Sequence, residues 1–592
     1  MWILRHLREF ASIIVVGFMA APCPAAPPIP APDDPIDSVM YKNPEMPALR
    51  VVNTFPSGLL NVWVEALARP EAEYKCQAAL AITSARKLGM TGLEAAIVPL
   101  TRELDKPGLH PSVGVALALA LVALEARAAA PSLLRVAESG DSDLREIIDP
   151  ALARWDYQPA RAVWLERLNQ PVPGRGTVLA VRALAATAEE KAAPRLRELV
   201  MSRDNPTPLR VESAHALGSL RTTGSEGDAL RLAAAASPQA VNERLAAASL
   251  LRQHKSDEAA RQLQVLATDP EPAVAAIALA RLVEMDPKLV NPLLDRVLAS
   301  PDAKVRGLGV ETLYLQPTEA NLKLLGDRMS DVHPDVRNKS RRALRQLAAL
   351  PEQRGPVIRE ATRVLAGSDW RGEEQAAILL AQLDHKPAAG RMVELLNSRR
   401  GEPCVAAAWG LRKLAQPDTL PAALEYFRRT FEAGVTAGRR NLPRAAVDRQ
   451  LCQLAQFMGV ARYWPANAVL PNLIGLQATA GPEARTAAIW ALGWLHAGKP
   501  VPALVGAFVD RIVVVPLGPV DDIRVRTMSA VALGLMKAKE GLPTLREYYG
   551  DKQSSFDLVI ACGWAIEQIT GEAVPRVTKE QAQRNWFVAP LR

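Results

Sequence analysis

The sequence predicts an all-α protein, an α-solenoid in which antiparallel helix pairs stack into a right-handed superhelix. Two observations support this fold class. Val274, Val305 and Val336 begin similar segments and follow one another at intervals of 31 residues (305 − 274 and 336 − 305). Each of these segments continues as one helical pattern, and a second helical pattern follows it after a turn. Because one helix pair cannot bury its apolar stripe alone, a period of this length indicates stacked pairs.

The first 25 residues have the pattern of a secretory signal peptide. Arg5 and Arg8 precede an apolar run of about a dozen residues, and small residues surround a cleavage point after Ala25. The run is shorter than the roughly 20 residues that a membrane-spanning helix needs. We therefore expect an exported protein, periplasmic or secreted. An uncleaved N-terminal membrane anchor, lipid attachment through Cys23 and a cytoplasmic product are the alternatives.

Residues 26–55 form the next predicted segment. They are rich in proline, lack a helical apolar period and carry acidic residues at Asp33, Asp34 and Asp37. Such a composition is typical of a semi-rigid extended linker.

Residues 56–570 form the predicted solenoid, and one repeat shows how it is built. Val336, Ser340, Ala343, Leu344 and Leu347 fall on one stripe of a helix, so this stripe is expected to face the core. The acidic residues before and at the start of each such helix are expected to act as N-caps and to favour the positive end of the helix dipole. Second helices are predicted at Asn291–Leu298, Leu322–Met329 and Arg391–Leu396.

The segment Pro334-Asp335-Val336-Arg337 and the alanines and leucines after it resemble HEAT repeats, in particular the short bacterial repeats related to those of phycobilin lyases. Weaker copies extend over nearly the whole chain after residue 56, in roughly fifteen repeats. The resemblance implies the fold and gives no catalytic residue, because no residue of this sequence can be matched to a lyase active site.

Two segments and the C-terminus depart from the period. Phe427–Arg444 is expected to be a long loop between helices, and Ile512–Val515 the end of a second helix. Residues 571–592 are expected to fold back as a tail that caps the last apolar face, as the end of a solenoid requires.

Composition and motifs narrow the function. Hydrophobic residues make up 49% and charged residues 23% of the chain, which excludes disorder throughout. The five cysteines are too few for a disulfide-rich scaffold, and we expect Cys76, Cys404, Cys452 and Cys562 to be mostly buried thiols. The histidines are isolated, and zincin, CxxC, Walker and nucleophile-elbow motifs are absent from the sequence. No catalytic, cofactor-binding or metal-binding residue is therefore predicted.

Two kinds of residue are candidates for an interaction surface. Trp490 and Trp494 share one helix face and are interpreted either as core filling or as an aromatic patch on the concave surface. The second kind is a set of arginines, namely Arg337, Arg341, Arg428, Arg429, Arg439 and Arg440. They are interpreted either as solvated or repeat-bridging residues or as a binding surface for an anionic partner.

The function predicted from the sequence is an exported, non-catalytic scaffold that binds other proteins through its concave surface. A phycobilin-lyase-like assembly factor is one alternative. Binding of nucleic acid or another polyanion through the arginine clusters is a second alternative, and nucleic acid is the less expected partner for an exported protein. No cofactor and no small-molecule substrate is predicted, and no transmembrane span beyond the N-terminal signal.

Overall fold

The computed structural model describes residue 29 and residues 35–582, except 140, 171, 235–239, 433–441, 476–479, 515–518 and 552. The predicted signal peptide and residues 583–592 of the predicted tail lie outside the described residues.

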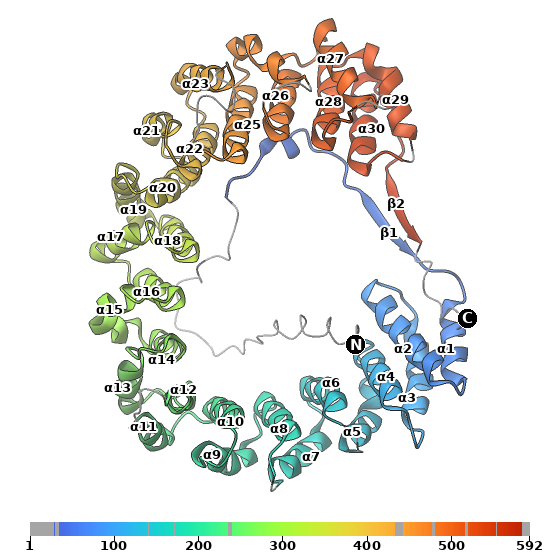
Figure 1. The fold of residues 1–592 in the computed structure, drawn as a ribbon, viewed down its shortest axis with the longest axis vertical. Helices are drawn as coiled ribbons and strands as arrows, with labels where there is room; N and C mark the ends of the chain where they lie inside the picture. The colour runs from blue at the N-terminus through green and yellow to red at the C-terminus, as the bar shows by residue number, and fades with distance from the viewer. Residues whose placement is uncertain are drawn as a thin grey trace.

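The described chain is an all-α solenoid of helix pairs, as predicted. One helix of each pair lies on the inner side of a curved array, and its neighbours along the array are the inner helices of adjacent pairs (Figure 1). The inner helices are α2 (Ala72–Lys87), α4 (Pro111–Ala123), α6 (Ser142–Arg154), α8 (Arg175–Ala186), α10 (Thr207–Leu220), α12 (Val241–Leu250), α14 (Pro272–Met285), α16 (Ala303–Leu315), α18 (Pro334–Leu347), α20 (Trp370–Gln382), α22 (Gly401–Leu414), α25 (Arg444–Val460), α26 (Pro482–Leu495), α28 (Ile523–Met536) and α30 (Phe556–Thr570).

The outer helices are mostly shorter. They are α1 (Leu59–Ala68), α3 (Ile97–Leu104), α5 (Ala130–Ser139), α7 (Gln158–Leu168), α9 (Ala193–Met201), α11 (Glu226–Ala234), α13 (Asp257–Leu266), α15 (Leu294–Leu298), α17 (Glu319–Arg328), α19 (Pro351–Leu365), α21 (Ala389–Leu395), α23 (Leu420–Glu432), α27 (Pro502–Ile512) and α29 (Leu542–Gly550). Between α25 and α26 the chain instead forms the 3₁₀ turns Trp464–Ala468 and Leu470–Leu473.

The repeat period explains the core. Val274, Val305 and Val336 lie in the first turns of α14, α16 and α18, and all three are buried. The predicted stripe of α18 from Val336 to Leu347 is also buried. The 31-residue spacing therefore places one apolar side chain at the same point of successive inner helices.

A recurrent turn joins the inner helix of a pair to its outer helix. One or two residues after the end of the inner helix, the chain adopts a left-handed conformation, with φ between 49° and 56°, at Glu125, Ala188, Asp384, Ala415 and Lys537. A 3₁₀ turn and the outer helix follow in each case. L-residues disfavour this conformation by about 1–2 kcal/mol, so glycine would fit better.

Replacing Ala415 by glycine is therefore expected to stabilise the protein by about 1 kcal/mol, because its φ of 50° costs an alanine more than a glycine. Chemical denaturation of wild type and variant measures the change. Ala273→Gly, at an exposed position inside α14, is the matched control and is expected to destabilise. A change in the free energy of unfolding with the same sign for both variants would contradict the explanation.

Buried ion pairs connect successive repeats. Arg306 on α16 donates through Nε and Nη2 to both carboxylate oxygens of Asp331, at 2.8 and 2.7 Å, just before α18. Arg244 on α12 and Asp269 form the same bridge two repeats earlier. In these repeats an inner helix is therefore bound to the segment that precedes the next inner helix.

This bridge corrects one detail of the sequence interpretation. Asp302 caps α16 as expected, by accepting from the backbone N–H groups of Lys304 and Val305. At α18 the cap is His333, while the carboxylate of Asp331 is used by the arginine of the preceding repeat.

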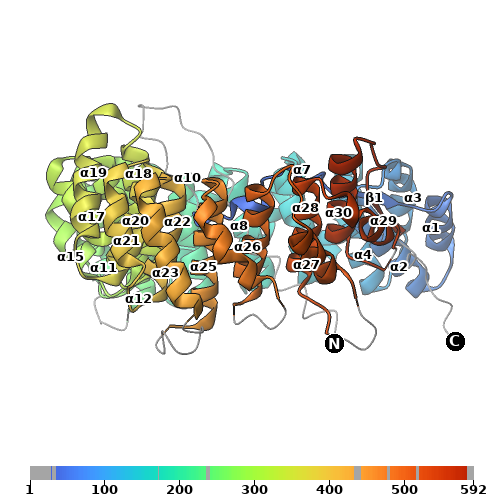
Figure 2. The ribbon, with the colours of Figure 1, turned by 90° about the horizontal axis from the view of Figure 1, so that it is seen from above.

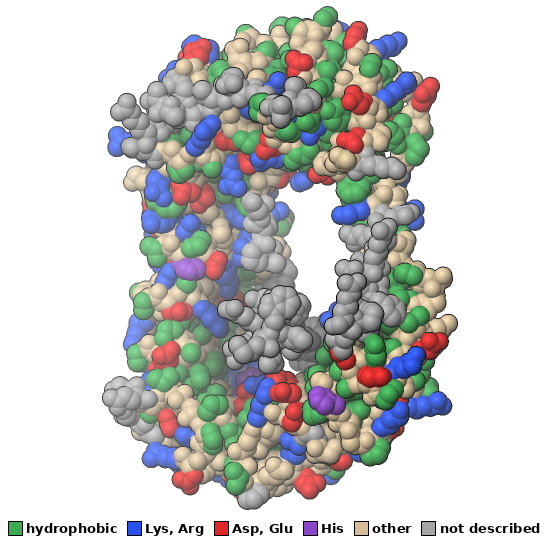
Figure 3. All heavy atoms as spheres, turned by 45° about the vertical axis from the view of Figure 1, so that its right-hand side comes forward, with side chains coloured by type: hydrophobic (Ala, Val, Ile, Leu, Met, Phe, Trp, Pro, Cys, Tyr) green, Lys and Arg blue, Asp and Glu red, His purple; other side chains and the backbone are tan. Residues whose placement is uncertain are grey.

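The solenoid curves into a ring (Figure 1). Seen from above, the helix pairs form a band of roughly constant height (Figure 2). A space-filling view shows an opening through the ring (Figure 3). The first and last repeats face each other across a gap that two strands bridge.

These strands are β1 (Arg50–Thr54) and β2 (Thr578–Ala582), which pair in parallel with Arg50 opposite Thr578. No strand is expected here from the sequence, because the two segments lie at opposite ends of the chain and neither has a strand-like apolar alternation. Just before β2, residues 572–577 follow the last repeat: the hydroxyl of Tyr549 donates to the carbonyl of Pro575 at 2.7 Å.

Residues 35–46, which we call the strap, precede β1. They belong to the segment expected to be a linker, and they form a 3₁₀ turn at Val39–Tyr41. The strap is bound along the inner face of α22, α25 and α26 (Figure 1). This docking is not predicted from the composition.

Candidate functional site

Asp37 anchors the strap at the junction of α22 and α25. Its Oδ1 accepts hydrogen bonds from Trp409 Nε1–H at 3.1 Å and from Arg412 Nη2 at 2.5 Å. Its main-chain carbonyl accepts from Arg412 at 2.8 Å and from Gln453 Nε2 at 3.0 Å. Arg412 and Gln453 are also bonded to each other, at 2.9 Å, so the two helices present a connected polar group to the strap.

The following residues are held mainly through their backbone. The N–H of Met40 donates to Gln456 Oε1 at 3.3 Å, and Gln456 Nε2 donates to the hydroxyl of Ser38 at 3.1 Å. The Met40 side chain is buried at 2% exposure. The carbonyl of Asn43 accepts from Trp490 Nε1–H at 2.5 Å. The strap is thus bound at three successive inner helices.

Helical spacing creates this groove. Trp409 and Arg412 are three residues apart on α22, and Gln453 and Gln456 are three apart on α25, so each pair shares one helix face. We call the surface formed by these four residues and Trp490 the strap groove.

Trp490 is at once a core residue and a strap ligand. Its side chain is 1% exposed, and only its indole N–H reaches the strap. Gly459 makes room for it, since a Cβ there would lie 2.6 Å from Trp490 Cζ3. Trp494 packs edge-on against Trp490, with 6.4 Å between the ring centroids. It is half-buried, and the guanidinium of Arg462 lies over its ring. Of the two predicted tryptophans, Trp490 therefore belongs to the groove: its ring is buried in the core, and its indole N–H donates to the strap.

The groove stabilises the charged form of Asp37. Partial burial raises the pKa of this carboxyl, but hydrogen bonds from Trp409, Arg412 and Lys42 outweigh burial and hold the pKa well below its usual range.

Docking of the strap is therefore expected to weaken as the pH falls below about 4. A detached Asp37 has a pKa of about 4, and the docked carboxyl has a lower one, so its contribution is complete above pH 4 and is lost as the pH falls toward the docked pKa. The ¹⁹F NMR signals of fluorotryptophan at Trp409 and Trp490 report docking. Asp37→Asn removes the titrating group, and circular dichroism checks that the helices persist. A pH response identical in the variant would contradict the assignment.

The predicted candidate Arg337 bridges parts of its own solenoid. Its Nη1 donates to the carbonyls of Asp331 and Val332 at 3.4 and 3.3 Å, and its guanidinium lies 5.6 Å from the ring of Trp370. These contacts match the repeat-bridging interpretation.

Arg341 was expected on the solvated side of its helix, and the structure corrects this. It is 1% exposed, and it donates to the side-chain oxygens of Gln375 and Gln382 on α20, both at 3.0 Å. An inner helix is covered by its outer partner and by an inner neighbour on each flank, so more than one face is buried.

Arg428 and Arg429 lie on the outer helix α23, where both are near Glu425, at 2.9 and 3.6 Å. The strap groove is formed by α22, α25 and α26, so these two arginines are not part of it. Arg439 and Arg440 lie outside the described residues.

The described residues contain no group of three His, Cys, Asp or Glu side chains placed to hold a metal ion. His215 and His496 have pKa values lowered by burial, and His496 Nε2 lies 2.7 Å from Asn467 Oδ1. Within the same residues, every helix is too short or too polar to cross a bilayer.

The four predicted thiols Cys76, Cys404, Cys452 and Cys562 form no disulfide. Three are buried and Cys76 is half-buried. Burial raises the pKa of Cys452 and of Cys562 to about 12, so both stay protonated at neutral pH.

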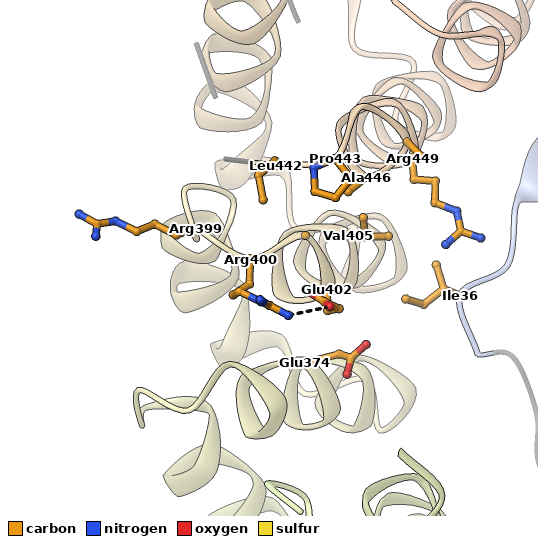
Figure 4. A pocket seen from close by; sticks show the side chains of 12 residues that line it. Ile36, Glu374, Arg399, Arg400, Glu402, Val405, Leu442, Pro443, Ala446 and Arg449 are labelled. Atoms are coloured by element: carbon orange, nitrogen blue, oxygen red, sulfur yellow. Dashed lines mark hydrogen bonds and ion pairs between the residues drawn. The ribbon is translucent and has the colours of Figure 1, made fainter. Parts of the chain in front are cut away.

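A pocket of about 500 Å³ adjoins the start of the strap (Figure 4). Ile36 forms one wall, and Arg449 on α25 points toward it (Figure 4). Glu374 and Glu402 lie on the opposite side, where Glu402 is paired with Arg400. Burial raises the pKa of Glu374. The pocket thus lies beside Ile36, between α20, the start of α22 and the start of α25.

Sequence reasoning did not predict the contacts of the strap groove, and it gave no role in binding to Arg412, Gln453 and Gln456. One signal was available: α25 is apolar on most of its surface, yet it carries glutamines at 450, 453 and 456, all of them buried. Glutamines at a spacing of three in a buried helix need partners. Gln450 finds one within the solenoid, whereas the other two find theirs in the strap.

No family model and no curated protein sequence matches the chain. Among solved structures, 87% of the chain aligns with 72% of Kap95p in its complex with RanGDP, at 11% identity and a TM-score of 0.49. For yeast importin-beta (Kap95p) alone, 87% of the chain aligns with 73% of that protein, at 12% identity and a TM-score of 0.48. For Kap121p, 87% of the chain aligns with 57% of that protein, at 13% identity and a TM-score of 0.46. These likenesses concern the fold alone.

Proposed function

We propose that the protein is a non-catalytic scaffold that binds other proteins along the inner face of its ring. The observation that carries this proposal is the strap itself. Side chains of three inner helices hold a short peptide segment with a 3₁₀ turn at its centre, largely through its main-chain carbonyl and N–H groups. A surface that binds main-chain groups in one segment offers the same hydrogen bonds to a segment of another protein.

The inner helices also carry exposed charges away from the strap groove. Arg182 on α8 is well exposed and is paired with Glu212 on α10. Exposed charged pairs of this kind contribute little to stability, so a partner can displace them at low cost. This part of the inner face is thus accessible to a partner.

The alternative function, binding of a polyanion through the arginine clusters, has less support. Arg337 and Arg341 are engaged with other groups of the solenoid, and Arg428 and Arg429 lie beside a glutamate. A polyanion would have to compete with these contacts. The relation to phycobilin-lyase repeats also stays a prediction, which incubation with a bilin and a search for a spectral shift would test.

Export is part of the proposal and rests on residues 1–25 alone. If the signal peptide is cleaved, the partner is a periplasmic or secreted protein; if it is kept as an anchor, the ring is held at the membrane. Fractionation of cells that produce the full chain distinguishes these cases.

Site-specific photo-crosslinking tests the proposed surface. A photoreactive residue replaces Arg182 on the inner face in one variant, and Val265, 72% exposed on the outer helix α13, in a matched control. After exposure to envelope and culture fractions with nuclease at 50 and 200 mM salt, we expect one discrete protein linked to position 182 and none to position 265. Crosslinks of equal yield from both positions, or capture lost with nuclease, would overturn the proposal.

A further inference from the structure

Besides its hydrogen bonds to the strap backbone, the strap groove contacts particular side chains of the strap. It offers a guanidinium and an indole N–H to one carboxylate, that of Asp37. Three residues later it encloses one unbranched apolar side chain, that of Met40. The side chains in between contribute less: Val39 is partly buried, and Ser38 accepts a hydrogen bond through its hydroxyl.

The strap packs on the surface of the groove and does not insert between the helices. Tyr41 is 52% exposed although it follows Met40 directly, and the Lys42 side chain is 69% exposed. The strap also contributes no helix to any pair of the solenoid. Its removal would therefore leave the repeat-to-repeat contacts of α22, α25 and α26 in place.

We infer that the strap groove is a docking site for a peptide segment of a partner protein that carries a carboxylate three residues before an unbranched apolar side chain, with a 3₁₀ turn after the carboxylate, and that residues 37–43 fill the groove when the partner is absent. The inference rests on the proposed function and specifies the partner segment. Charge complementarity favours this occupant, because Arg412 is 5% exposed and its charge needs an anion inside the groove.

Competition with the strap sets the affinity that a partner shows. A tethered segment acts at an effective concentration of about 1 mM. The apparent affinity of any partner is reduced by the fraction of molecules whose groove is open. Weakening the strap should therefore strengthen partner binding without any change in the groove.

A fluorescent peptide with the sequence of residues 35–46 tests this on the full chain. Fluorescence anisotropy measures its binding to wild type, to Asp37→Asn, and to Asp37→Asn with Met40→Ala. We expect affinity for the double variant to exceed that for wild type by at least about tenfold, with the single variant in between. A peptide with asparagine in place of its aspartate should bind the double variant roughly tenfold to a hundredfold more weakly.

Two controls make the outcome decisive. Circular dichroism confirms that the variants are folded, and Arg428→Ala, outside the groove, should leave peptide binding unchanged. No binding to a folded double variant would overturn the inference. Sedimentation over a range of concentrations tests the other occupant: a wild-type dimer that dissociates in Asp37→Asn would assign the groove to the strap of a second copy and would also overturn the inference.

The two proposals fail separately. If photo-crosslinking at position 182 captures a partner while the peptide does not bind, the scaffold function stands and the strap groove is only a structural contact. If the peptide binds and no protein is captured at position 182, the groove is a peptide site but the broad inner face is not the interface.

Discussion

Replacing Asp331 by alanine is expected to lower the free energy of unfolding by about 3–5 kcal/mol, the usual cost of leaving a buried charge without its partner. The Arg306 side chain is 8% exposed and that of Asp331 is 3% exposed, and two hydrogen bonds of 2.7 and 2.8 Å join them. Without the carboxylate, the guanidinium keeps only the carbonyls of Ser300 and Pro301. Urea denaturation, with hydrogen exchange in α16 and α18, measures the loss.

Asp335→Ala is the matched control for this prediction. Asp335 lies in the same lead-in segment, but its side chain is 89% exposed, so its removal should change the stability by less than about 0.5 kcal/mol. A double variant, Arg306→Met with Asp331→Leu, should recover part of the loss, because an apolar pair avoids the unpaired charge. An Asp331→Ala variant as stable as the control would show that the bridge contributes nothing.

The bridge also makes the solenoid sensitive to acid. Burial raises the pKa of Asp331, but the hydrogen bonds from Arg306 and from the His333 N–H, together with the charge of Arg306, outweigh burial, so the pKa lies below its usual value. Asp521, which pairs with Arg485 between α26 and α28, shows the same direction for the same reason. Both contributions are complete above the ordinary pKa of about 4 and are lost as the pH falls below it.

The repeat architecture could be predicted because it is local. The 31-residue spacing from Val274 to Val336 and the stripe on one helix each involve residues within one or two repeats, and all of these residues are buried as expected. The burial of Arg341 could not be predicted, because a single helical stripe describes a helix with one covered face. Only the arrangement of neighbouring inner helices shows that this arginine lies between α18 and α20.

The strap groove could not be predicted for a different reason. Asp37 and Trp409 are 372 residues apart, and they meet only because the solenoid curves far enough to bring its last repeats to the N-terminal segment. The curvature is a small rotation per repeat summed over many repeats, and no local pattern in the sequence records it. The proline content of residues 26–55 predicts an extended linker but not its binding surface.

Closure of the ring is expected to depend on Arg412. Undocking the strap would leave the first and last repeats joined by β1 and β2, and an isolated two-stranded sheet is marginally stable in water. Arg412→Ala removes three hydrogen-bonding contacts: two with Asp37 and one with Gln453. Because the Asp37 side chain is 34% exposed, we expect a loss of about 2 kcal/mol of docking free energy, near the lower end for hydrogen bonds to charged groups.

Small-angle scattering and limited proteolysis measure the consequence for the ring. In Arg412→Ala the radius of gyration should increase, and residues 35–46 should become a cleavage site that wild type protects. Arg428→Ala removes an arginine of the exposed outer surface and should change neither property. The same scattering curve for all three proteins would show that the strap does not close the ring. An opened ring in Arg412→Ala alone would mean that one buried guanidinium couples the occupancy of the groove to the shape of the whole solenoid, so that a partner which displaces the strap also opens the ring.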